Sequence, residues 1–179
     1  FGPHDVAVVP IAALFWVAQS QIWNTYNIWV RDHLQLKFGD WTMPVPWLQS
    51  LDGLAPFILL PPILWFWRAQ AAKGREPDEV GKIAIGCFLF GAGTLLLAGS
   101  QFITDGAGKT PLLLAVLFHF VSNLGWLFTV PSLNTLFSRL APRSVNATML
   151  GVNSLSVTIG SFISGRLGGL YETLAPLQF

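Results

Sequence analysis

The stretch between Lys109 and Arg139 constrains the fold more than any other feature, because it carries no charged side chain. A helix needs about 20 predominantly apolar residues to cross the hydrocarbon core of a bilayer, and this stretch is long enough. Its interior is nevertheless not purely apolar. Polar side chains and one tryptophan recur within it every three or four residues: His119, Ser122, Asn123, Trp126 and Thr129.

This spacing places the recurring side chains on one side of a helix. Because a polar stripe is unfavourable against lipid, we expect it to face the interior of a bundle or a water-filled cavity. Pro131 removes one backbone hydrogen bond and predicts a kink two turns before the basic end of the helix at Arg139. These features are typical of a transporter helix.

The composition of the whole chain also indicates a membrane protein. Hydrophobic residues make up 53% and charged residues 11% of it, whereas about a quarter of the residues in a soluble protein are charged. A net charge of +1 without a basic patch argues against nucleic acid as a partner. A single cysteine, Cys87, excludes an internal disulfide framework and a cysteine metal site. The sequence therefore predicts an all-α integral membrane protein whose first partner is the lipid bilayer.

Catalytic and cofactor motifs are missing from the sequence. It holds no H-E-x-x-H, G-x-S-x-G, P-loop or dinucleotide-binding glycine string. The histidines His4, His33 and His119 fall in different segments, which argues against a metal site within the membrane. We therefore expect no enzyme activity, no catalytic residues, no metal and no cofactor.

Charged linkers divide the chain into uncharged stretches that predict five membrane-spanning helices, at about 6–30, 47–67, 83–104, 110–138 and 146–170. Lys and Arg gather in the linkers 68–82 and 139–145, which predicts that both are cytoplasmic in a multi-pass protein of the plasma or inner membrane. The chain opens without methionine and ends abruptly, so we expect 1–179 to be one transmembrane half-domain of a longer protein.

Five strings, read in order, resemble the C-terminal half of the proton-dependent oligopeptide transporters, a branch of the major facilitator superfamily. They are LFWVAQSQ, PVPWLQSLDGLAPF, KGREP followed after four intervening residues by Lys, NLGWLFTVPSLNTLFSRLAPRSVNATMLGV, and GLYETLAP. The resemblance implies helices seven to eleven of a twelve-helix transporter. Two six-helix halves would hold the substrate between them and rock to give alternating access. The N-terminal half and the last helix would then be absent from this chain, and protons and peptides would be its further partners.

Four positions depart from the family pattern where the resemblance implies substrate or proton contacts. The acidic residue of helix seven is Ser20, the glutamate of helix ten is Trp126, and the tryptophan of helix eleven is Asn153. The asparagine of helix eight is Asp52. A site that exchanges glutamate for tryptophan should lose much of its attraction for the ammonium group of a peptide.

Two ionisable side chains are candidates for proton coupling. Asp52 is the only acidic residue within a predicted span, where it could hold a substrate amine or carry the coupling proton; it could instead be a hydrated carboxylate near a helix N-terminus. His119 lies near the middle of its span, and histidine changes charge between about pH 5 and 8. The alternative for His119 is a neutral ring that bonds a neighbouring helix.

The remaining site candidates line the expected cavity or bend its helices. As cavity lining we predict Gln19, Ser20, Asn24, Asp52, Trp126 and Asn153, although each polar side chain could equally join two helices. As kinks or gating hinges we predict Pro56, Pro61, Pro62 and Pro131.

The sequence favours a secondary transporter that takes up di- and tripeptides, or related small organic solutes, with protons. A major facilitator transporter of a non-peptide solute is the first alternative. A membrane scaffold subunit is a second, from a different class, but it would not need spans lined with proline and polar residues.

Overall fold

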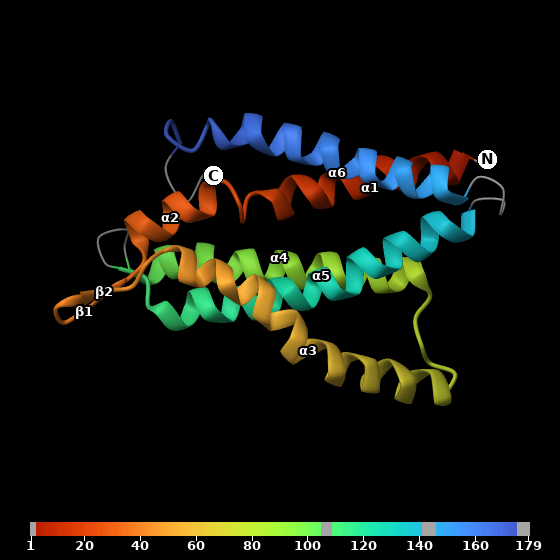
Figure 1. Ribbon diagram of the computed structural model, residues 1–179, viewed down its shortest axis with the longest axis horizontal. Helices are drawn as coiled ribbons and strands as arrows, with labels where there is room; N and C mark the ends of the chain where they lie inside the picture. The colour runs from red at the N-terminus through yellow and green to blue at the C-terminus, as the bar shows by residue number, and fades with distance from the viewer. Residues whose placement is uncertain (1–2, 105–108, 141–145, 175–179) are drawn as a thin grey trace. The chain divides into compact units, whose positions relative to one another are not determined.

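The computed structural model describes residues 3–104, 109–140 and 146–174, and nearly all of its regular structure is helical (Figure 1). Residues 141–145 of the linker expected to be cytoplasmic lie outside the described residues. The elements in order are α1 Pro3–Ser20, α2 Thr25–His33, β1 Lys37–Phe38, β2 Trp41–Thr42, α3 Pro46–Ala72, α4 Glu79–Ile103, α5 Leu112–Leu140 and α6 Asn146–Gly168.

Within the described residues, four helices are long and apolar enough to cross a membrane. They are Pro46–Ala72, Glu79–Phe102, Leu112–Arg139 and Ala147–Gly168, and each coincides with a span expected from the sequence. Half of the most apolar window of α5 is buried, against 11% of that of α3. α5, which covers most of the uncharged stretch between Lys109 and Arg139, is therefore the most buried of these helices.

The first expected span is corrected by the structure, which does not form one helix over 6–30. α1 ends at Ser20, and α2 begins only at Thr25. In the turn between them the backbone amides of residues 21–24 bond carbonyls three residues back, and the side chain of Gln21 donates to the carbonyl of Ser164 over 3.0 Å. The turn between α1 and α2 is thus accompanied by a side-chain hydrogen bond to α6.

The chain divides into two compact units. Unit 1 comprises residues 1–32 and 133–179, and in it α1 lies along α6. The two backbones are in close contact at Gly160. A Cβ atom there would lie 2.5 Å from the Cβ of Trp16 and 2.7 Å from the carbonyl oxygen of Ala13, which shows that the contact requires glycine.

Replacing Gly160 with alanine should lower the free energy of unfolding by about 1–3 kcal/mol, because the added methyl group has no space against the α1 backbone. Gly165→Ala is the matched control on the same helix, since its Cβ would meet nothing within 4 Å. Thermal unfolding of the purified protein in detergent compares the two variants. Equal midpoints would show that α1 and α6 do not pack closely at Gly160.

Unit 2 comprises residues 33–132 and contains α3, α4 and the first two-thirds of α5. α4 and α5 are in backbone contact at Gly86 and Gly125. A Cβ at Gly125 would lie 2.6 Å from the carbonyl oxygen of Gly86 and 2.8 Å from the amide nitrogen of Phe90. α4 begins at the N-cap residue Asp78, whose side chain accepts a hydrogen bond of 2.8 Å from the Gly81 amide.

A network around Thr110, which we call the Thr110 junction, fixes one end of unit 2. The Thr110 amide donates to the carbonyl of His33 over 2.7 Å, and its carbonyl accepts from the Gln35 amide over 2.9 Å. Its hydroxyl lies 3.1 Å from the hydroxyl of Ser100 and accepts from the Gln101 amide group at 3.2 Å. The junction thus joins the segment after α2, the end of α4 and the segment before α5.

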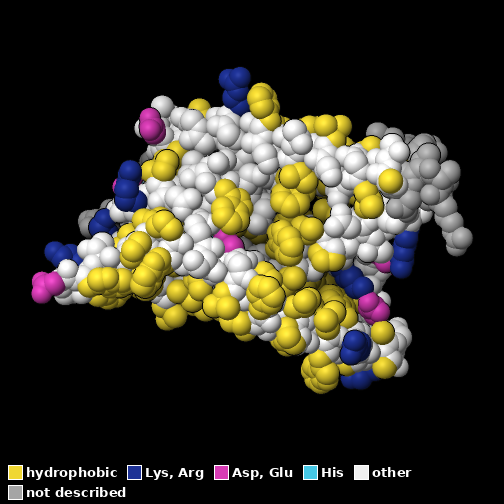
Figure 2. All heavy atoms as spheres, viewed as in Figure 1, with side chains coloured by type: hydrophobic (Ala, Val, Ile, Leu, Met, Phe, Trp, Pro, Cys, Tyr) yellow, Lys and Arg dark blue, Asp and Glu magenta, His cyan; other side chains and the backbone are white. Residues whose placement is uncertain are grey.

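α3 begins with Pro46 at its first turn, where proline is tolerated, and remains helical through Pro56, Pro61 and Pro62. Its side chains are largely exposed, Phe57 to 80% and Trp65 to 72%, and Figure 2 shows hydrophobic side chains along this helix. Near its end the Trp67 ring packs 4.7 Å from that of Phe128 on α5, measured between centroids. In a membrane protein such an apolar surface is suited to lipid or to further helices.

Candidate functional site

Three polar side chains meet in the interior of unit 2, one from α3 and two from α5. The Nδ1 atom of His119 lies 2.8 Å from Oδ1 of Asp52, and the Nδ2 atom of Asn123 donates to the same oxygen over 2.9 Å. We call these residues the Asp52 cluster. The structure therefore brings together the two side chains that the sequence indicated separately as proton-coupling candidates.

Both helices carry the cluster at a similar distance from their first residue. Asp52 is six residues after Pro46 in α3, and His119 is seven residues after Leu112 in α5. At 1.5 Å per residue these offsets are about 9 and about 10 Å. Asn123 follows His119 by one helical turn, so both side chains point to the same side, and its Nδ2 also donates to the His119 carbonyl over 2.8 Å.

The cluster is shielded from water. The side chain of His119 is fully buried and that of Asp52 is 11% exposed. Oδ1 of Asp52 holds both contacts, whereas its other oxygen, Oδ2, is buried and finds no hydrogen-bond partner among the described residues. An isolated carboxylate is very unfavourable in such surroundings, so its stability depends on these two neighbours.

Three of the predicted cavity residues join helices within unit 1. The hydroxyls of Ser20 and Ser161 lie 3.0 Å apart. Nδ2 of Asn24 donates to Oγ of Ser164 at 3.3 Å. Asn153 of α6 donates from Nδ2 to Oδ1 of Asn134 on α5, over 2.7 Å. These bonds match the alternative in which such side chains hold helices together.

The other predicted residues have less specific surroundings. Gln19 is half-buried, and its Oε1 finds no partner among the residues that the structure describes. Trp126 is half-buried on α5, next to the close contact at Gly125. Gln19, Ser20, Asn24 and Asn153 belong to unit 1, and Asp52 and Trp126 to unit 2. A cavity shared by all six stays a prediction, as does a gating role for the four prolines.

Sequence reasoning missed Asn123 and Ser164 as members of the polar contacts. Asn123 was on the expected polar stripe, and its offset of four residues from His119 places the two side chains on the same face of the helix. No such signal marked Ser164, because its partners Gln21 and Asn24 lie 143 and 140 residues away in the chain. Among the described residues no three His, Cys, Asp or Glu side chains gather as metal ligands.

Known proteins resemble the chain in sequence. Residues 6–175 match the profile of the POT family (PTR2). A peptide transporter of Yersinia enterocolitica is 29% identical over 161 residues, which cover 88% of this chain and 31% of that protein. A di-/tripeptide transporter of Lactococcus lactis subsp. cremoris is 22% identical over 180 residues, covering 97% of this chain and 36% of that protein.

Solved structures share the fold. A POT family transporter in complex with a thioalcohol-conjugated peptide superposes with a TM-score of 0.82 at 26% identity, over 96% of this chain and 36% of that one. Another, in complex with 5-aminolevulinic acid, gives a TM-score of 0.85 at 24% identity, over 98% of this chain and 36% of that one. These similarities confirm the predicted helical fold of the major facilitator type.

The chain spans about a third of the length of the relatives it matches. The family match nevertheless extends over almost the whole of the present sequence, and the superposition on a solved transporter covers 96% of this chain. The chain therefore belongs to the POT family, and its four long apolar helices are those of a multi-pass membrane protein.

Proposed function

We propose that this chain is the C-terminal transmembrane half of a secondary transporter that takes up di- and tripeptides, or related small organic solutes, together with protons. The observation that carries the proposal is the Asp52 cluster, a buried carboxylate and imidazole in contact inside two membrane-spanning helices. Ionisable groups at such depth are unfavourable and typically belong to a substrate or proton pathway. The family and the named relatives support peptides as the substrate class.

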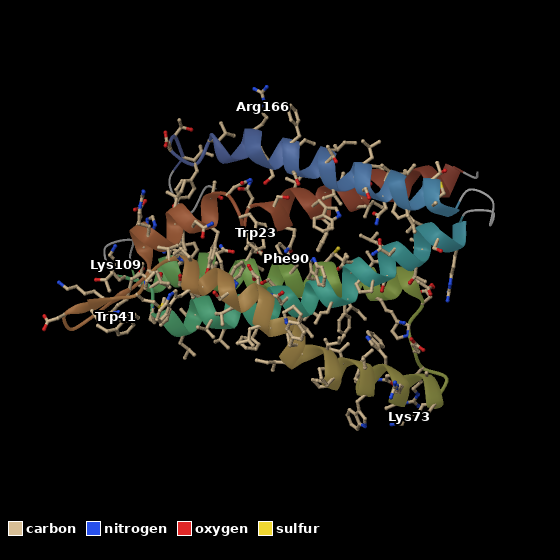
Figure 3. The ribbon with its side chains drawn as sticks, in the orientation of Figure 1. Trp23, Trp41, Lys73, Phe90, Lys109 and Arg166 are labelled. Atoms are coloured by element: carbon tan, nitrogen blue, oxygen red, sulfur yellow. The ribbon has the colours of Figure 1, made fainter. Side chains whose placement is uncertain are left out.

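On this proposal the N-terminal half of the same transporter completes the substrate site and the alternating-access mechanism. We place the protein in the plasma or inner membrane, with linkers 68–82 and 139–145 on the cytoplasmic side. Figure 3 supports this orientation within unit 2, because Lys73 lies at the end opposite Lys109 and Trp41. The linker with Lys73 also contains Arg68, Arg75 and Lys82, and cytoplasmic linkers are rich in Lys and Arg.

A non-peptide solute is the second candidate, and one feature of the chain favours it. Trp126 is half-buried where the family pattern has a glutamate, and Asn153 donates to Asn134 where the pattern has a tryptophan. A site without that glutamate attracts the amino terminus of a peptide less strongly. The two candidates differ in substrate and agree on proton-driven uptake.

Uptake of radiolabelled dipeptides into liposomes tests the proposal, using the complete polypeptide that contains this chain. With an inward proton gradient we expect accumulation of about tenfold per pH unit if one proton accompanies each peptide, because one unit supplies about 1.4 kcal/mol. Protein-free liposomes and liposomes with a protonophore are the controls. Proton-driven uptake of amino acid derivatives but not of peptides would select the second candidate. No gradient-dependent uptake of either class would contradict the proposal.

A further inference from the structure

We propose that the hairpin formed by β1 and β2 is a membrane anchor. Its aromatic side chains, Phe38 and Trp41, together with Trp47 of α3, form a surface that we call the hairpin aromatic face. This surface binds phospholipid in the headgroup region of the leaflet at which α3 begins. The inference concerns a surface outside the Asp52 cluster, and it does not depend on which solute is transported.

The pairing of the two short strands gives the hairpin two different faces. Lys37 pairs with Thr42 across the strands. Phe38 pairs with Trp41. Residues directly opposite each other in an antiparallel pair have their side chains on the same face, and neighbours along a strand point to opposite faces. One face of the hairpin is therefore aromatic, and the other, with Lys37 and Thr42, is polar.

The three rings of the hairpin aromatic face lie together but remain exposed. The centroid of the Trp41 ring is 6.4 Å from that of Phe38 and 5.5 Å from that of Trp47. Phe38 is 47%, Trp41 48% and Trp47 59% exposed. The described residues therefore leave a cluster of large apolar side chains uncovered, and such clusters mark surfaces that contact a membrane or another molecule.

The position of Trp47 along α3 gives the depth of this surface in a bilayer. Trp47 is the second residue of α3, and Arg68 follows it by 21 residues on the same helix. At 1.5 Å per residue they are about 32 Å apart, close to the hydrocarbon thickness of about 30 Å. Trp47 and the adjacent Trp41 ring therefore lie at one edge of the hydrocarbon core. Figure 3 shows Lys109 at this end of unit 2 as well, as expected for a lysine at the end of a span.

The surface of α3 continues from the hairpin aromatic face and favours lipid as its partner. Three large apolar residues follow Trp47 at intervals of about two, three and five helical turns, which places them on the same side of the helix. They are Leu54, Ile58 and Trp65, and all are at least half exposed. Figure 2 shows hydrophobic side chains along this helix. An apolar stripe that runs the length of a membrane-spanning helix faces acyl chains, and the hairpin extends it to the headgroups.

Tryptophan suits this position because its ring is apolar while its indole N–H needs an acceptor. The headgroup region offers both surroundings, since acyl chains lie beside ester and phosphate oxygens, and tryptophan is enriched there. With Trp41 turned towards lipid, the opposite face presents Lys37 and Thr42 to water. Both faces of the hairpin are then in the surroundings that their side chains require.

The hairpin is joined to the Thr110 junction, which transmits the anchor to unit 2. Before β1, the Gln35 amide donates to the Thr110 carbonyl over 2.9 Å. After β2, the Met43 amide donates to the Leu36 carbonyl over 2.8 Å, and the Met43 side chain is buried. Anchoring the hairpin in the headgroup region therefore sets the depth of the Thr110 end of unit 2 in the bilayer.

Spin labels on the two faces of the hairpin test the inference in the complete polypeptide, reconstituted in phospholipid liposomes. Cysteines replace Phe38, Trp41, Lys37 or Thr42 one at a time, after Cys87→Ala and replacement of any other cysteine. Collision with oxygen, which concentrates in lipid, is compared with collision with a water-soluble nickel complex. We expect the oxygen-to-nickel ratio at positions 38 and 41 to exceed that at positions 37 and 42 severalfold.

Charge substitutions provide a matched pair of variants. Trp41→Glu places a carboxylate on the hairpin aromatic face, where it is unfavourable against lipid, so a label at position 38 should become accessible to nickel. Thr42→Glu adds the same charge to the polar face and should leave that label unchanged. Equal effects of the two variants would contradict the assignment of the faces.

Fluorescence quenching tests the native aromatic face without a label. The emission that Trp41→Phe removes belongs to Trp41. Lipids brominated near the top of their acyl chains should quench this emission severalfold more than aqueous iodide does. Nickel access at positions 38 and 41 equal to that at 37 and 42 would place the hairpin in water and overturn the inference. Protection of positions 38 and 41 from both reagents would show that protein covers them and would overturn it too. Neither result bears on the proposed transport, because these measurements use no substrate.

Discussion

Replacing His119 with leucine should destabilise the protein by about 3–5 kcal/mol, the largest effect that we expect from one side chain. The substitution removes the contact of Nδ1 with Oδ1 of Asp52 and leaves a buried carboxylate whose remaining hydrogen bond within the cluster comes from Asn123. Breaking one side of a buried pair has this size of effect, because the remaining charge is not compensated. Titration with sodium dodecyl sulfate in mixed micelles measures the free energy of unfolding.

A double-mutant cycle distinguishes this effect from simple loss of packing. Asp52→Leu combined with His119→Leu removes both groups together, and replacement of a buried pair by apolar side chains is often neutral. We therefore expect the double variant to regain most of the stability that the single variant loses. If the two losses add instead, Asp52 and His119 do not interact in the folded protein.

Replacing Gly86 with leucine should lower the free energy of unfolding by about 3 kcal/mol or more, near the upper limit for overpacking. Its first side-chain atom would lie 2.1 Å from Oγ1 of Thr129 and 2.6 Å from the carbonyl oxygen of Gly125. A backbone atom cannot rotate away, so α4 and α5 would have to separate. Thermal unfolding in detergent and the yield of monodisperse protein report the change.

Gly91 offers a control on the same helix, because a Cβ there would meet nothing within 4 Å. Gly91→Leu should leave stability unchanged or raise it slightly, since leucine favours helix more than glycine does. Similar losses in both variants would mean that glycine acts through the conformation of α4 and not through its contact with α5.

The spans were predictable from sequence because a bilayer requires long uncharged stretches, and α3 to α6 fall within a few residues of the expected ranges. The interruption after Ser20 was not predictable. It is accompanied by hydrogen bonds from Gln21 and Asn24 to Ser164, and local periodicity carries no information about a partner so distant in the chain.

The candidate site was predictable only in part, for the same reason. Asp52 and His119 could each be selected, because an ionisable side chain in an apolar span is unusual. Their contact could not, since it joins positions 67 residues apart and depends on how α3 packs against α5. The partner of Asn123 was not predictable either, because an amide on the polar face of a helix can form hydrogen bonds with many different groups.

The Thr110 junction has a mechanical consequence for unit 2. It cross-links three segments at one end of the helices through backbone and hydroxyl bonds, so bending of α4 or α5 has its fixed point there. When a helix bends about a fixed point, atoms further from that point move further. His119, nine residues after Thr110, therefore moves less than the far end of α5.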